Sequence, residues 1–192
     1  MIVVSKQVLA DENQLQQTLG DLFRYRVLEF FERQVVIGTG VGRNVLGLAT
    51  AATASGATGG NAADRLGATG SLLADMGWEA NLVILNPNDW HTIRSERADT
   101  GNGQYLSGGW AQPAQPSIWS MPVVSTSSLP VGTALVMDTA AALVLDREAP
   151  TVLISSEDLD NFVKNMVTIL AEMRGGLAIL NPSAILSVAL TP

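Results

Sequence analysis

Apolar side chains recur every three or four positions along residues 12–36, which is the spacing of one face of an α-helix. This stripe contains Leu15, Leu19, Leu22, Phe23, Val27, Phe30, Phe31 and Gln34 or Val35. Polar side chains such as Gln16, Arg24 and Glu29 fall on other faces. The pattern predicts one helix of about 24 residues, roughly twice the mean length of globular helices.

Shorter apolar segments predict a mixed α/β region in the middle of the chain. Residues 62–76 have helical spacing, although glycines weaken that helix. The continuous apolar run at residues 80–85 suits a strand that is buried on both faces. Pro87 directly after Asn86 predicts a capped helix over residues 87–96.

The remainder of the chain has the composition of short strands and loops. Strands are predicted at residues 119–125, 133–137, 141–146, 151–155 and 184–190. Residues 49–60 and 99–117 are rich in small residues or in Gly and Pro, and are predicted to be loops. The apolar residues of 161–172 fit either the helical or the strand period, and the alternation of β-branched residues favours a long strand.

Composition adds a prediction about partners. Hydrophobic residues make up 47% of the 192 residues and charged residues only 15%, which suggests that neighbouring copies cover part of the surface. The net charge is −7 and the 11 lysines and arginines are scattered, so tight binding to nucleic acid or to an anionic membrane is not expected. The absence of cysteine excludes disulfides and thiolate metal sites. We also expect no membrane-spanning segment and no export signal.

The glycine run at residues 38–42 admits two interpretations. A phosphate-binding loop needs a strand before the glycines and a helix after them, with the helix N-terminus at the phosphate. Here the glycines follow the long predicted helix and no G-K-[ST] sequence is present. We therefore predict that Gly38 ends the helix and that a tight turn follows.

Four ordered motifs resemble one known family. They are GTGVGRNVLGL (38–48), WEANLVILNPNDWHTIR (78–94), SIWSMPVVSTSSLPVGTALVMD (117–138) and LVLDREAPTVLISSEDLDNFVKNMVTILAEMRG (143–175). Each is similar to a passage of the HK97-type phage major capsid proteins, in the same order, over about residues 3–190. Several spaced motifs in one order form a far more specific signal than any single pattern.

The resemblance implies an α+β fold with an axial α/β lobe and a peripheral lobe of a long spine helix and long strands. It places residues 1–48 in the peripheral lobe, 49–155 in the axial lobe and 156–192 in the return strands of the peripheral lobe. The implied function is that of the coat protein of a tailed phage or prophage, which forms the pentamers and hexamers of an icosahedral shell around double-stranded DNA.

The resemblance also implies a location in the virion, assembly in the bacterial host cytoplasm, and scaffolding, protease and portal proteins as further partners. We expect no cofactor, no dedicated metal site and no enzymatic activity. Within the same fold, the alternative is an encapsulin-like compartment that packages enzymes.

An alternative of another class is a small hydrolase or nucleotide-binding enzyme that uses residues 38–42 and His91. His91 is the only histidine, and no G-x-S-x-G sequence is present to support a catalytic triad. We therefore expect His91 to lie on a helix surface.

Two departures from the family pattern bear on chemistry. Family members carry an N-terminal arm and an extended loop ahead of the point where this sequence begins. Asn165 and Glu172 match the isopeptide acceptor and the proton-accepting carboxylate of self-crosslinking members, whose donor lysine lies on that loop. A buried carboxyl could act as such a base, but we expect both residues to be structural here, with crosslinking left open for a longer parent chain.

A further departure from the family pattern concerns strand pairing. Gly175 and Gly176 replace larger residues and put strand pairing there in question.

The remaining candidates concern contacts between subunits. Asp146, Arg147 and Glu148 are predicted to form a charged turn, which is either solvated or part of an ion pair between subunits. Trp110 lies in the Gly/Pro-rich loop and is the aromatic side chain that we expect at an interface.

Overall fold

The computed structural model describes residues 1–7, 13–98, 103–107 and 116–190. The chain divides into two compact units. Unit 1 consists of Met1–Glu32 and Val144–Gly176, and unit 2 consists of Arg33–Leu143 and Leu177–Pro192.

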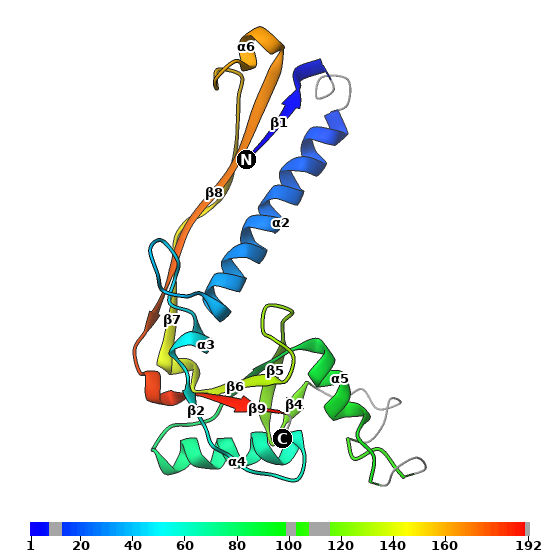
Figure 1. Ribbon diagram of the computed structural model, residues 1–192, viewed down its shortest axis with the longest axis vertical. Helices are drawn as coiled ribbons and strands as arrows, with labels where there is room; N and C mark the ends of the chain where they lie inside the picture. Colours follow the sequence, from blue (N-terminus) through cyan, green and yellow to red (C-terminus); the bar gives the residue numbers. More distant parts are fainter. Residues whose placement is uncertain (8–12, 99–102, 108–115, 191–192) are drawn as a thin grey trace. The chain divides into compact units, whose positions relative to one another are not determined.

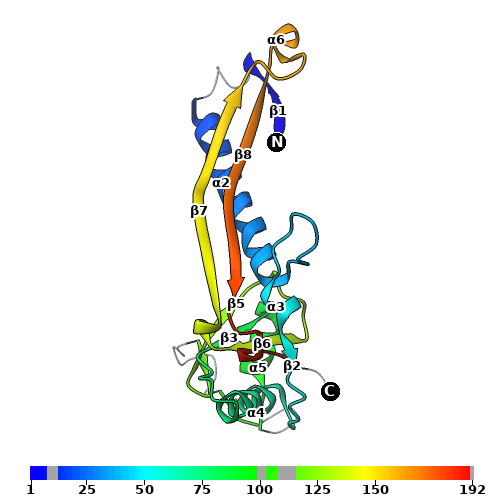
Figure 2. The ribbon, with the colours of Figure 1, turned by 90° about the vertical axis from the view of Figure 1, so that its left-hand side faces the viewer.

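Unit 1 is a long helix packed on a narrow sheet (Figures 1 and 2). The sheet has the strand order β1 (Ile2–Ser5), β8 (Met166–Ile179), β7 (Ala142–Ser155), and β1 is antiparallel to β8. β7 and β8 run in opposite directions and α2 (Asn13–Ile37) lies along them. All three long elements continue into unit 2 along the chain.

The predicted long helix is confirmed as α2. Leu19 and Phe23 pack against the buried Val167 and Ile169 of β8, whereas the side chain of Leu15 lies outside the described residues. The predicted apolar stripe is too wide, because Leu22 and Phe30 belong to it and are exposed. A sheet of three strands covers only part of the helix surface.

The predicted turn at residues 146–150 is wrong. β7 runs without interruption from Ala142 to Ser155, so the two strands predicted there are one. The sequence Asp-Arg-Glu-Ala-Pro resembles a turn because Asp and Pro are typical turn residues. β7 is an edge strand of its sheet, and edge strands tolerate proline and use charged side chains to block pairing with other chains.

The predicted strand over residues 161–172 is partly wrong. Asn161–Lys164 form one helical turn, α6, and Asn165 ends it in the left-handed conformation at φ 54°. Asparagine is one of the few residues that adopt this conformation readily. β8 then begins at Met166 and continues through both Gly175 and Gly176. A Cβ at Gly175 would lie 2.7 Å from Cζ of Phe31, so glycine there makes room for the helix.

Unit 2 is built on a six-stranded sheet with the order β2-β9-β6-β3-β5-β4. The strands are β2 (Thr53–Ala54), β3 (Leu82–Leu85), β4 (Ser117–Ile118), β5 (Met121–Ser125), β6 (Thr133–Met137) and β9 (Ile185–Ala189). β3 is parallel to β5 and antiparallel to β6. Two single 3₁₀ turns, Thr139–Ala141 and Pro182–Ala184, precede β7 and β9.

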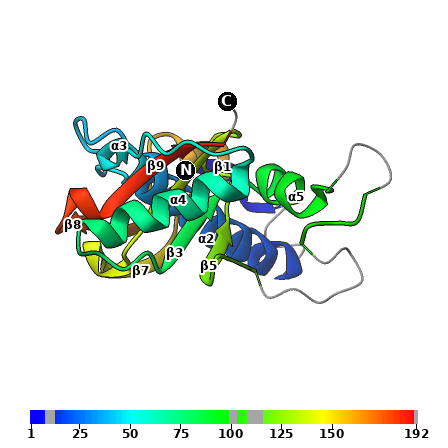
Figure 3. The same ribbon diagram turned by 90° about the horizontal axis from the view of Figure 1, so that it is seen from below.

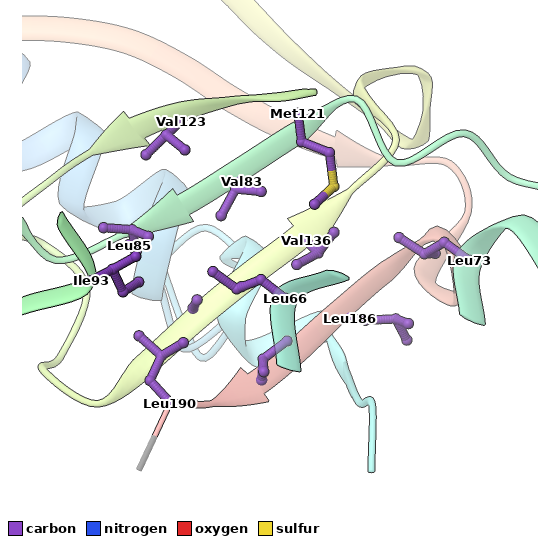
Figure 4. Packing of buried hydrophobic residues seen from close by; sticks show 12 residues of the cluster. Leu66, Leu73, Val83, Leu85, Ile93, Met121, Val123, Val136, Leu186 and Leu190 are labelled. Carbon is purple, nitrogen blue, oxygen red and sulfur yellow. The ribbon is translucent and has the colours of Figure 1, made fainter. Parts of the chain in front are cut away.

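Both faces of the central strands β3, β6 and β9 are buried. On one face, α4 (Ala62–Asp75) and α5 (Pro87–Ser95) cover a cluster that includes Leu66, Val83 and Val136 (Figures 3 and 4). On the other face, the end of α2 and α3 (Leu48–Ala51) cover a cluster that includes Ile84 and Leu135. Successive strand residues thus enter opposite clusters, and the prediction of a strand buried on both faces is confirmed.

The sequence placed most elements of unit 2 correctly. The predicted helices at 62–76 and 87–96 are α4 and α5, and the caps at Asn61 and Asn86 accept backbone N–H bonds. Residues 119–125 give a shorter strand, because Trp119 and Ser120 have positive φ and form the turn between β4 and β5. Residues 49–60 are not only loop, since they contain the end of α3 and β2.

The two units differ from the predicted lobes in their boundaries. The predicted borders follow residues 48 and 155, whereas the units change after Glu32, Leu143 and Gly176. The boundary after Leu143 differs from the predicted one because β7 is a single strand and most of it belongs to unit 1. The other two boundaries fall inside α2 and β8. None of the helices in the described ranges is long and apolar enough to cross a membrane.

Candidate assembly surface

Unit 1 has very few buried side chains for its size. Among its described residues, Val167 and Ile169 are the buried hydrophobic side chains. The large hydrophobic side chains that it exposes are Met1, Ile2, Val3, Leu22, Tyr25, Leu28, Phe30, Val144, Leu145, Leu153, Ile154, Leu159, Phe162, Val163 and Leu170. So much exposed apolar surface is typical of a region that another protein surface covers.

The connection between β7 and β8, residues 156–165, is the most exposed apolar part of unit 1, and we call it the tip. Leu159, Phe162 and Val163 are 91%, 86% and 87% exposed. Leu159 also has a positive φ of 48°, a conformation that costs a non-glycine residue free energy and tends to persist at functional sites.

Buried hydrogen bonds hold the tip in place. Asn161 is buried, and its Nδ2 donates to Oγ1 of Thr168 at 2.6 Å. The Thr168 hydroxyl donates to Oδ2 of Asp158 at 2.9 Å. The backbone N–H of Lys6 donates to the Asn165 carbonyl and ties β1 to the same region. The tip is therefore a preorganised apolar projection.

Ion pairs on unit 1 are exposed. Arg26 donates to Glu29 at 2.7 Å, and this hydrogen bond raises the pKa of the Arg26 guanidinium. Lys164 donates to Asp160 at 3.2 Å within the tip. Exposed pairs of this kind add little to folding stability, so they set the charge of the surface more than its stability.

The predicted interface charges lie in the middle of β7. Asp146, Arg147 and Glu148 are exposed there, on a strand and not in a turn. Trp110, the other predicted interface residue, lies outside the described residues.

The two residues matched to crosslinking chemistry do not meet within one chain. Asn165 ends α6 and Glu172 lies seven positions further along β8. At about 3.3 Å per residue, a strand separates them by about 23 Å. Glu172 is exposed, so the apolar burial that would make it a base is not observed.

The glycine run forms a hairpin, residues 38–47, which we call the glycine hairpin. α2 ends at Ile37, and the N–H of Gly47 donates to the Gly38 carbonyl. A Cβ at Gly47 would overlap the Gly38 backbone. The prediction that a helix ends here and a tight turn follows is confirmed.

The residues of the enzyme alternative lie on different elements, with His91 on α5 and residues 38–42 in the glycine hairpin. His91 is exposed on α5, as expected. Within the described ranges, no group of three or more His, Cys, Asp or Glu side chains could hold a metal ion.

A buried polar contact that the sequence did not reveal joins two of the motifs. Asn86 Nδ2 donates to the Leu129 carbonyl at 2.8 Å, and Asp89 Oδ2 accepts from the N–H of Gly132 at 2.8 Å. Asn86 and Asp89 are both buried. The Asn-Pro-x-Asp start of α5 therefore holds the Leu-Pro-Val-Gly turn ahead of β6.

A second unpredicted feature lies on α4. The indole N–H of Trp119 donates to the Ala63 carbonyl at 2.8 Å. A Cβ at Gly67 would lie 2.7 Å from the indole nitrogen, so glycine in this helix makes room for the ring. In the sequence, Gly67 marks a close approach to the helix but does not identify Trp119 as the partner.

Comparison with known proteins adds the family. The model of the phage capsid family matches residues 1–189. The chain belongs to this family. It is 36% identical over 190 residues to the major capsid protein of Enterobacteria phage HK97, covering 96% of this chain and 49% of that protein. The chain thus spans about half the length of the curated relative that it matches.

Solved structures agree on the fold. A chain from Mycobacterium phage Bobi has a TM-score of 0.78 at 16% identity, covering 100% of this chain and 70% of that one. The capsid of an empty GTA particle has a TM-score of 0.72 at 16% identity, covering 100% of this chain and 72% of that one. The predicted α+β, HK97-like capsid fold is confirmed.

Proposed function

We propose that this chain acts as a phage major capsid protein and packs against copies of itself in pentamers and hexamers. The observation that carries the proposal is unit 1, which exposes apolar side chains along its length and buries only Val167 and Ile169 among its described hydrophobic residues. A region with so small a core gains stability when neighbours cover it.

A closed symmetric shell explains how such surfaces can work together. Each contact in a closed array can be weak, because several contacts act on the same subunit at once. We propose that Asp146, Arg147 and Glu148 on β7 add ion pairs between subunits. We expect Asn165 and Glu172 to be structural, and any crosslink that used both would draw them from different copies.

The charge of the chain supports a DNA container. A net charge of −7 with scattered lysines and arginines favours a wall that does not hold its DNA tightly. The proposed location is the virion, after assembly in the host cytoplasm with scaffolding, protease and portal proteins. Similarity to a phage major capsid protein supports DNA as the content of the shell, in place of the enzyme cargo of an encapsulin-like compartment.

Negative-stain electron microscopy and light scattering of the purified protein test the proposal. Wild-type protein should form rings, tubes or shells. Phe162→Asp with Val163→Asp should reduce particle yield by about tenfold or more, since a charge in a buried apolar contact costs several kcal/mol.

The matched control is Phe162→Leu with Val163→Leu, which keeps the tip apolar and should retain assembly. Both variants should keep the wild-type circular dichroism, because these side chains contact little of their own subunit. Equal particle yields from the aspartate and leucine variants would contradict the role of the tip. A wild type that stays monomeric at all concentrations and salts would contradict the proposed function.

A further inference from the structure

Unit 2 carries an open groove along α4 that the fold itself does not fill. Its volume is about 910 Å³. The small residues Gly70 and Ala74 of α4 line it, together with the side chains of Trp78 and Trp119. Trp119 is 63% exposed although its indole N–H is bonded to the Ala63 carbonyl. The groove is therefore lined by small side chains and by two aromatic side chains.

The charge of the groove limits what fits it. Asp64 and Glu79 line it and are exposed. Among the described residues that line it, none is a lysine or arginine. An occupant with a small apolar side chain beside a positive charge is complementary to such a surface.

The glycine hairpin has these properties. Val41 at its end is 73% exposed, and Arg43 next to it is also exposed. Gly40 and Gly42 on either side of Val41 have φ of 69° and 67°, so the hairpin is narrow where it would enter a groove.

Hydrogen bonds fix the hairpin in this form. The N–H of Gly40 donates to the Val45 carbonyl at 3.0 Å. Asn44 Nδ2 donates to Oγ1 of Thr39 at 3.1 Å. A preordered loop loses little conformational entropy when it binds.

The hairpin and the groove are different surfaces of unit 2, since no residue of the hairpin lines the groove. The hairpin leads directly into α3 and then β2, the outermost strand at one edge. The groove lies along α4, and Trp119, in the turn between β4 and β5, also lines it. A contact between hairpin and groove therefore joins two copies head to tail, and such a contact closes into a ring when the rotation between copies is regular.

We propose that the glycine hairpin of one copy docks in the α4 groove of the next copy. Val41 enters between Trp78 and Trp119, and Arg43 faces Asp64 and Glu79. This rests on the proposed shell function and adds which two surfaces meet within a ring of subunits.

Engineered disulfides test the contact, because the chain contains no cysteine. Val41→Cys combined with Ala74→Cys should give, on oxidation, a ladder of covalent oligomers that ends at a ring. Copies with Val41→Cys mixed with copies with Ala74→Cys should give covalent dimers and no longer species. The control pair, Val131→Cys with Ala74→Cys, places the first cysteine at another exposed valine. On oxidation it should give no covalent oligomers.

Charge reversal tests the pairing. Arg43→Glu should lower the yield of the ladder by about fivefold, as expected for an exposed ion pair. Adding Asp64→Arg and Glu79→Arg to that variant should restore the yield. If the added arginines do not restore the yield of the ladder although the circular dichroism is unchanged, the assigned partners of Arg43 are wrong.

Microscopy of the same samples separates this inference from the proposed function. Particles without a ladder, or an equal ladder from the control pair, overturn the contact and leave the shell function in place. If the Val41→Cys, Ala74→Cys variant gives the ladder but the wild type forms no particles, the shell function is overturned and the contact is supported.

Discussion

At the scale of single residues, buried polar groups and glycines fix the positions of whole segments. Asn86 and Asp89 use their side chains to hold the turn ahead of β6. Gly67 is needed because the Trp119 ring lies against it. At these positions, losing a side-chain hydrogen bond or adding a Cβ changes the local structure.

Asp89→Ala should lower the free energy of unfolding by about 1.5–3 kcal/mol, since it removes a charged acceptor and leaves the N–H of Gly132 without its partner. Asn88→Ala is the control, because that side chain is exposed on the same helix, and its effect should stay within about 0.5 kcal/mol. Urea denaturation of the dissociated subunit measures both. Similar effects of the two substitutions would contradict the assigned bond.

Gly20 and Gly67 form a matched pair of helical glycines. A Cβ at Gly20 meets nothing within 4 Å, so Gly20→Ala should raise the free energy of unfolding by about 1 kcal/mol. Gly67→Ala should instead give no gain or a loss, and should change the near-UV circular dichroism as the Trp119 ring moves. Stabilisation by both alanines, with an unchanged near-UV spectrum, would be inconsistent with the packing of Trp119.

At the scale of elements, β7 shows how an edge strand can contain residues that otherwise mark a turn. Its middle carries Asp146, Arg147, Glu148 and Pro150, and it lies at the edge of a three-stranded sheet. These residues keep an exposed strand of 14 residues from pairing with unrelated strands.

Glu148→Thr with Pro150→Thr should therefore increase non-specific aggregation several-fold, under conditions where the wild type stays dissociated. Asp75→Thr removes the same charge from the end of α4 and should not do so. Light scattering over time compares them. If both variants aggregate equally, aggregation depends on net charge alone, and the protective role of the edge residues is contradicted.

The sequence predicted most elements because their signals are local. The spacing along α2, the cap at Asn86 and the apolar run of β3 each appear within a few residues. The errors arose where a partner far along the chain decides the structure. Pro150 sits in a strand because β8 supports β7. The helical turn that Asn165 ends is a different case, because Asp158, Asn161 and Thr168 hold it by local side-chain hydrogen bonds that the spacing of apolar residues does not reveal. The α4 groove depends on Trp119, which is 52 positions from Gly67, so no local pattern predicts it.

At the scale of the whole molecule, the two units are stabilised to different degrees by their own residues. Unit 2 buries both faces of the central strands of its sheet, whereas unit 1 packs α2 on a sheet whose cluster has two buried members. The proposed shell function accounts for such an imbalance, since neighbouring copies complete a shell subunit.

Hydrogen exchange of the same protein, as free subunits and as assembled particles, tests this account most directly. In free subunits, the amides of residues 144–176 should exchange much faster than those of β3 and β6, because opening unit 1 exposes little buried surface. Assembly should slow the exchange of unit 1 by about tenfold or more, while β3 and β6 change little. Exchange in unit 1 that is already as slow as in β6, and that assembly leaves unchanged, would contradict the claim that neighbouring copies complete this unit.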